Sequence, residues 1–130
     1  MPPSLHGLRD DIRAFADERD WAQFHSPRSL TLALTGEVGE LAALLRFLDD
    51  TAVYELLSTT DGRAAITEEI ADIAIFLVRL ADVCHVDIAT AVTEKIEVNG
   101  VRYPVNQARG SAAKYTELRP SDSERPGGTS

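Results

Sequence analysis

The chain carries the stretch Gly36-Glu37-Val38-Gly39-Glu40 and, after 28 intervening residues, the stretch Glu69-Ile70-Ala71-Asp72. Both stretches lie in apolar surroundings, where an unpaired charge is expensive to bury. In a helix, carboxylates at positions i and i+3 project from neighbouring turns of one face. Each stretch therefore predicts a helix that presents a pair of carboxylates, and a positive group should hold them.

The two acidic pairs are predicted to face each other across an antiparallel helical hairpin. Glu40 lies eight residues before Leu48, the expected end of its helix, and Glu69 lies six residues after Arg63, the expected start of the next. At the α-helical rise these positions are about 12 Å and about 9 Å from the same end of the hairpin. Two facing pairs form an oxygen-rich cage, which suits Mg²⁺ or Mn²⁺. The predicted metal ligands are Glu37, Glu40, Glu69 and Asp72.

Hydrophobic periodicity predicts an all-α fold without strands. The expected helices run from Ser4, as N-cap, to a point before Trp21, from Pro27 to Leu48, from Arg63 to His85, and from Ile88 to Gly100 with Asp87 as N-cap. A short apolar piece, Val53–Leu57, lies in the connection between the second and third helices. We predict one domain over residues 1–118 and a disordered tail over residues 119–130, which are rich in Pro, Ser and Gly.

The composition narrows the cellular setting and the partners. The chain has 130 residues, 44% of them hydrophobic, and a net charge of -8, which disfavours a basic surface for nucleic acid polymers. It shows no membrane span and no secretory signal at Met1–Ser4. The single Cys84 cannot form an internal disulfide and is expected to be a buried thiol, so a cytoplasmic location is predicted.

The apolar character of the second and third helices predicts an oligomer. The third helix has apolar residues on more than one face and the second has almost no charge, so one small bundle cannot cover both. Gly36 and Gly39 each cost about 1 kcal/mol relative to alanine inside a helix. They indicate the close approach of a ligand or another backbone, or simply tight helix packing.

The acidic motifs and several longer strings resemble the MazG-like, all-α nucleoside triphosphate pyrophosphatases, and among them the dCTP pyrophosphatase branch. The resemblance covers nearly the whole chain except its ends and the connection at Asp49–Ala65. The strings are RDWAQFHSPRSL at Arg19–Leu30, GEVGEL at Gly36–Leu41, EEIADIAIFL at Glu68–Leu77, KIEVNGVRYPV at Lys95–Val105 and ARGSAAKYTEL at Ala108–Leu118.

This resemblance implies a four-helix-bundle-like MazG-type fold that assembles as a homotetramer, a dimer of dimers whose nucleotide pocket is completed by a neighbouring chain. It implies Mg²⁺-dependent hydrolysis of a dCTP-like deoxynucleotide to the monophosphate and pyrophosphate, which sanitises the nucleotide pool. The four acids would hold the metal, and Glu37 or Glu40 would take the proton of the attacking water. The implied substrate contacts are Trp21, Phe24, His25, Phe47, Phe76, Lys95 and Asn99.

Three positions depart from the pattern of this branch and bear on the preferred base. Phe47 and Phe76 stand where better-known members tend to have Trp and Tyr, and Ile12 stands where a histidine occurs in some members. Phe47 offers a smaller stacking surface than Trp, and Phe76 lacks a hydroxyl.

Other interpretations of the same residues remain open. Trp21 and Phe24 could staple the first two helices together, His25 could be an ordinary loop histidine, and Lys95 and Asn99 could be surface residues. A di-iron carboxylate bundle needs Glu-x-x-His spacing, which none of the three histidines has. A non-catalytic helical metal-binding interaction module is the alternative outside enzymes, although such a module would gain nothing from buried carboxylates.

Overall fold

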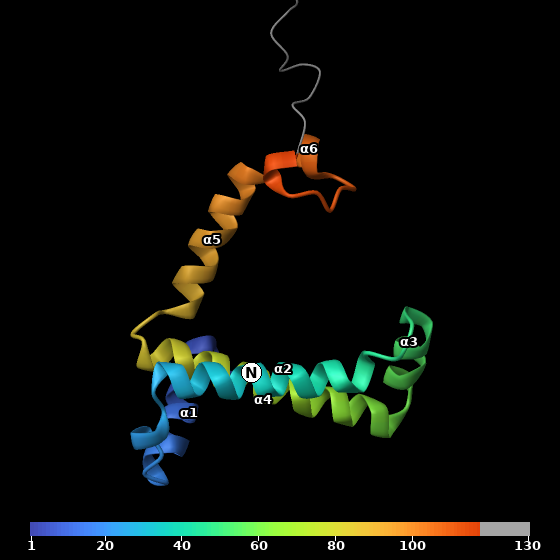
Figure 1. The fold of residues 1–130 in the computed structure, drawn as a ribbon. Helices are drawn as coiled ribbons and strands as arrows, with labels where there is room; N and C mark the ends of the chain where they lie inside the picture. Colours follow the sequence, from blue (N-terminus) through green and yellow to red (C-terminus); the bar gives the residue numbers. More distant parts are fainter. Residues whose placement is uncertain (118–130) are drawn as a thin grey trace, which may run out of the picture. The chain divides into compact units, whose positions relative to one another are not determined.

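The structure, a computed structural model, describes residues 1–117, which form helices, turns and loops without a β-strand (Figure 1). The predicted all-α class is therefore confirmed, and the predicted tail, 119–130, lies outside the described residues. The helices are α1 (Leu5–Glu18), α2 (Pro27–Leu45), α3 (Asp50–Ser58), α4 (Thr60–Val83), α5 (Ile88–Arg102) and α6 (Val105–Ala108). Short 3-10 turns lie at Ala22–Phe24 and Tyr115–Glu117.

Side chains placed before the first residue of four helices set where those helices begin. The Ser4 hydroxyl accepts from the Gly7 amide at 3.0 Å at the start of α1. At the later caps, oxygens of Ser26, Asp49 and Thr59 accept an amide hydrogen bond from the residue three positions on. Such caps satisfy amides that the first helical turn leaves without partners.

The helix boundaries differ from the sequence expectation around the connection between the two acidic helices. This connection folds into a helix of its own, α3, because Asp49 caps it. Thr59 caps α4, which therefore begins three residues before Arg63. Gly62 is buried, and a Cβ there would clash with the Leu56 carbonyl oxygen, so the turn from α3 into α4 needs a glycine.

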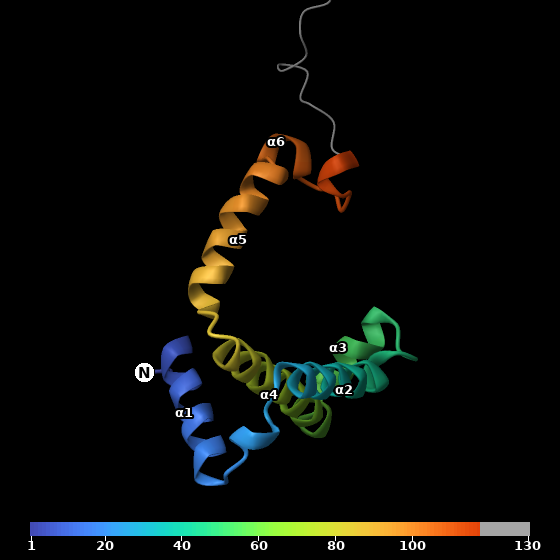
Figure 2. The same cartoon turned by 60° about the vertical axis from the view of Figure 1, so that its left-hand side comes forward.

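The chain divides into two units, Met1–Ile88 and the segment from Ala89 onward, which are described separately. In the first unit α2 and α4 run antiparallel and side by side, while α1 and α3 also pack against α4 (Figures 1 and 2). The second unit contains nearly all of α5, followed by α6 and the last 3-10 turn. The single-domain extent of residues 1–118 stays a prediction.

The core of the first unit is small. Its buried apolar side chains come from α1, α2 and α4, and they are Ala16, Leu30, Ile66 and Val78. Large apolar side chains on α2 and α4 stay exposed, among them Leu32 at 57% and Ile70 at 55%. Cys84 is exposed as well, so the expectation of a buried thiol is wrong for the single chain, because the residue follows the last turn of α4.

Tight packing within the chain does not explain the two glycines of the acidic motif. A Cβ at Gly36 or Gly39 would meet nothing within 4 Å. The remaining interpretation from the sequence is an approach by a ligand or by another chain.

None of the described helices is both long enough and apolar enough to cross a membrane.

Candidate functional site

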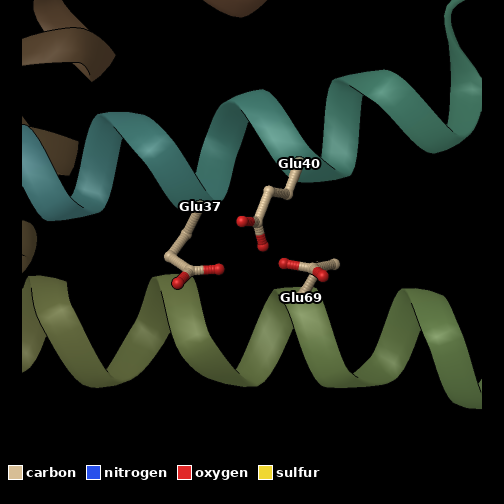
Figure 3. A group of neighbouring side chains, drawn as sticks. All are labelled: Glu37, Glu40 and Glu69. Atoms are coloured by element: carbon tan, nitrogen blue, oxygen red, sulfur yellow. The ribbon is translucent and has the colours of Figure 1, made fainter.

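Three carboxylates converge between α2 and α4 in the first unit (Figure 3). Glu37 and Glu40 project from neighbouring turns of α2, and Glu69 faces them from α4. One oxygen from each residue lies within 4.8 Å of the other two. The antiparallel hairpin predicted from the spacing of the motifs thus brings these three acids to one level.

The three acids have no compensating positive charge beside them, and Glu37 and Glu69 are half-buried whereas Glu40 is exposed. Glu37 and Glu69 each bury an oxygen, Oε2, that has no hydrogen-bond partner. No basic side chain among residues 1–117 forms an ion pair with Glu37, Glu40 or Glu69. Buried polar atoms normally find a partner, so these two oxygens fit a cation bound between the helices.

The same crowding perturbs the acidity of the cluster. Burial, together with the Glu69 and Glu40 carboxyls close by, raises the pKa of Glu37 to about 7. Burial also raises the pKa of Glu69, with further contributions from the charges of Glu40 and Asp72. Both shifts have the sign expected for carboxylates that lose water and face like charges.

Asp72 lies outside the three-carboxylate group, although the sequence predicts it as a fourth ligand. It stands one turn after Glu69 on α4, it is half-buried, and its charge raises the pKa values of both Glu37 and Glu69. Its place in the metal site stays a prediction.

The predicted aromatic contacts occupy several environments. Trp21 is 44% exposed and meets Phe15 edge to face, with ring centroids 5.7 Å apart and planes at 70°. Phe24 is 64% exposed. Phe47 is 85% exposed beneath the Arg46 guanidinium, whereas Phe76 is half-buried on α4.

His25 takes part in a half-buried polar contact that sequence analysis did not predict. Its Nδ1 accepts a hydrogen bond from Nε of Arg79 at 3.0 Å, and Arg79 is only 6% exposed. Arg79 also donates to Asp82, which receives two bonds from Arg13 of α1. A charged pair three residues apart inside an apolar helix was a signal that could have drawn attention to Arg79 and Asp82.

Lys95 and Asn99 lie on α5 in the second unit, and both are exposed there. They stand one helical turn apart, as expected for positions i and i+4. Their predicted contact with the phosphates stays a prediction.

A model of the MazG-like family matches residues 44–118, which is more than half of the chain. The chain belongs to the MazG-like family. The dCTP pyrophosphatase 1 of Mus musculus is 51% identical over 116 residues, which cover 89% of this chain and 68% of that protein. The Homo sapiens dCTP pyrophosphatase 1 is 48% identical over the same shares of both chains.

A crystal structure of a pyrophosphatase from Archaeoglobus fulgidus has the same fold. Its TM-score is 0.71 at 32% identity, and the match covers 80% of this chain and 95% of that one. The predictions of a MazG-type fold and of a hydrolase are confirmed by these similarities, and members of this family generally depend on a metal ion. The family match at residues 44–118 includes Glu69 but not Glu37 or Glu40. Glu37 and Glu40 are therefore assigned to the candidate site from their distances to Glu69 alone.

Proposed function

We propose that this chain is a Mg²⁺-dependent pyrophosphohydrolase that converts dCTP, or a dCTP-like deoxynucleotide, and water to the monophosphate and pyrophosphate. The observation that carries the proposal is the group of three carboxylates with two buried, unpartnered oxygens. About 50% identity to dCTP pyrophosphatases of four mammals supports the choice of substrate.

The donor set suits a hard divalent cation. Carboxylate oxygens are the ligands that Mg²⁺ and Mn²⁺ prefer, and no histidine or cysteine belongs to the group. Glu37, Glu40 and Glu69 would hold the ion, with Asp72 completing the site. When bound, the ion supplies charge for the phosphate oxygens and lowers the pKa of a water molecule.

The chain's own residues would bind the substrate and take up the proton of that water. We propose that Glu37 or Glu40 accepts the proton, because both project into the cluster from α2 (Figure 3). Trp21 and Phe76 would contact the base, since a flat pyrimidine stacks well on an aromatic ring. Lys95 and Asn99 are proposed phosphate contacts.

The decisive experiment is a panel of nucleoside triphosphates incubated with the full chain and Mg²⁺, with products separated by chromatography. We expect dCMP and pyrophosphate from dCTP. Release of the diphosphate with orthophosphate would contradict the cleavage position. Glu68→Gln is a matched control for Glu69→Gln, because Glu68 is exposed and lies outside the cluster.

A non-catalytic interaction module is the second candidate, and it predicts metal binding without turnover of any triphosphate. The di-iron interpretation gains no support from the described residues. Asp82 and His85 come nearest to the required spacing, but Asp82 is bound by two arginines and His85 is exposed.

We further propose a homotetramer, in which other copies cover the exposed apolar side chains of α2 and α4. The cytoplasmic location stays a prediction, as does the absence of a nucleic acid polymer among the partners.

A further inference from the structure

A polar network ties α1 and α4 to the turn that precedes α2. Arg79 donates from Nε to Nδ1 of His25 at 3.0 Å and from Nη1 to Oδ2 of Asp82 at 3.2 Å. Arg13 of α1 donates to both carboxylate oxygens of Asp82, at 2.9 Å and 2.5 Å. The carboxylate of Asp82 therefore holds the buried guanidinium of Arg79 against the imidazole ring.

This arrangement decides which nitrogen of His25 carries the proton. A guanidinium has only donors and does not lose its charge in proteins. Nδ1 must therefore present its lone pair to Arg79, and a neutral ring then carries its hydrogen on Nε2. Protonating Nδ1 would set two donors against each other, and burial together with the Arg79 charge lowers the pKa of His25. His25 thus stays neutral, with a hydrogen-bond donor at Nε2.

The position of His25 relates it to the acidic cluster. Glu69, Asp72, Phe76 and Arg79 are spaced along one face of α4. Arg79, and His25 with it, stands ten residues from Glu69, which is about 15 Å along the helix. On α2 the first residue, Pro27, is also ten residues from Glu37, and His25 lies two residues before this helix start. This separation is of the order of an extended nucleoside triphosphate.

The Nε2 atom itself has no hydrogen bond to any residue within 1–117. His25 as a residue is also partly exposed.

We propose that Arg79 is a positioning residue that fixes His25 as the neutral Nε2–H tautomer, and that this donor meets an acceptor on the edge of the nucleotide base. The first half stands on the network alone, and the second half depends on the proposed function. Cytosine presents an acceptor at ring atom N3, where thymine presents an N–H donor. A histidine that is held in the Nε2–H tautomer offers a donor at Nε2 and no acceptor there. It therefore favours N3 of cytosine over the N–H group of thymine.

The tautomer is tested by proton and nitrogen-15 NMR of the imidazole rings in the full chain without ligand. The His25 signals are identified as those that disappear in His25→Gln. We expect an Nε2–H tautomer whose pKa lies below the ordinary histidine value. Arg79→Met leaves Asp82 paired with Arg13, so His25 should titrate at higher pH in this variant. Arg79→Lys keeps a donor without acceptors and should restore the wild-type behaviour.

A proton on Nδ1 in the wild-type spectrum would overturn the first half, and this observation requires no variant to fold. An unchanged titration of His25 in folded Arg79→Met would overturn it too. Either result bears on the network whether or not the chain hydrolyses a nucleotide.

The base contact is tested by the ratio of kcat/KM for dCTP to that for dTTP. In Arg79→Met we expect this ratio to fall about tenfold, the order of one hydrogen bond, mainly through KM for dCTP. Arg79→Lys should recover most of the ratio. An unchanged ratio together with the expected NMR result would overturn the base contact alone. Failure of the wild type to hydrolyse any triphosphate would instead refute the proposed function, and the base contact with it.

Discussion

Glu37 and Glu69 each bury an oxygen that has no hydrogen-bond partner. The carboxylate cluster therefore lowers the free energy of unfolding when no metal is bound. We expect Glu37→Gln and Glu69→Gln to lose activity by about a hundredfold or more, since even outer contacts of a metal site cost 10–100-fold. Without metal, both variants should melt at higher temperature than the parent because like charges are removed. Mg²⁺ or Mn²⁺ should raise the melting temperature of the parent more than that of either variant.

Calorimetry with and without the ion measures this difference, and Glu68→Gln should behave as the parent. Parental turnover in both cluster variants would show that the acids are not the catalytic site.

Trp21 is exposed over 44% of its surface and forms a T-shaped contact with Phe15, so part of its ring surface is open to a base. We expect Trp21→Ala to raise KM for dCTP more than it lowers kcat, because stacking acts in both the ground and the transition state. The loss should be about 1–3 kcal/mol. Tyr54→Ala removes an aromatic ring that is 72% exposed on α3 and should leave KM unchanged. An unaltered KM in Trp21→Ala would assign this ring to packing alone.

Among the secondary-structure elements, α1 is joined to α4 through Asp82, whose side chain is 10% exposed. Hydrogen bonds and charges from Arg13, together with the charge of Arg79, hold the pKa of Asp82 below its ordinary value of 3.8. A depressed pKa means that the folded state resists protonation, so the stabilisation is present above pH 3.8 and is lost as the pH falls through the lower folded value.

We therefore expect Asp82→Asn to lower the free energy of unfolding at neutral pH by about 1–3 kcal/mol. The parent should become less stable as the pH falls from neutral toward 3. The variant lacks the Asp82 carboxylate and should show a smaller decrease in stability over this range. Denaturant titrations from neutral pH to pH 3 test both effects. Asp10→Asn is the control, because Asp10 is 57% exposed and surface ion pairs contribute little. Identical pH profiles for Asp82→Asn and the parent would contradict this account.

At the scale of the whole molecule, the single chain covers too little of its apolar surface. Four apolar side chains are buried among the described residues, while α2 and α4 expose Leu32, Val38, Ile70 and Leu77 at 47–57%. A Cβ added at Gly36 or Gly39 would meet nothing within 4 Å. We expect these surfaces to meet other copies, as a homotetramer would require.

Light scattering and activity, measured together over a dilution series, test this assembly. We expect turnover per chain to disappear as the protein dissociates, since the neighbouring chain is expected to complete the nucleotide pocket. A fully active monomer would refute both the shared pocket and the interpretation of the exposed apolar side chains.

The sequence by itself determined the helical class, the starts of α1, α2 and α5, and the convergence of Glu37, Glu40 and Glu69. These features depend on caps, periodicity and the helical rise, which involve residues close together in the chain. The exact extent of α2 and α4 was less predictable, because helix ends depend on which of several nearby residues forms the capping hydrogen bond. The helical state of the connection, α3, was missed because its apolar segment is short.

Only the tertiary structure decided that Arg79 meets His25, which lies 54 residues away in the sequence. It also decided that Asp82 accepts hydrogen bonds from both Arg79 and Arg13, and that Asp72 stands outside the three-carboxylate group. The physical reason is that such contacts depend on how α1 and α2 pack against α4, and on the rotamer of each side chain. Neither the packing nor the rotamer leaves a periodic pattern in the sequence.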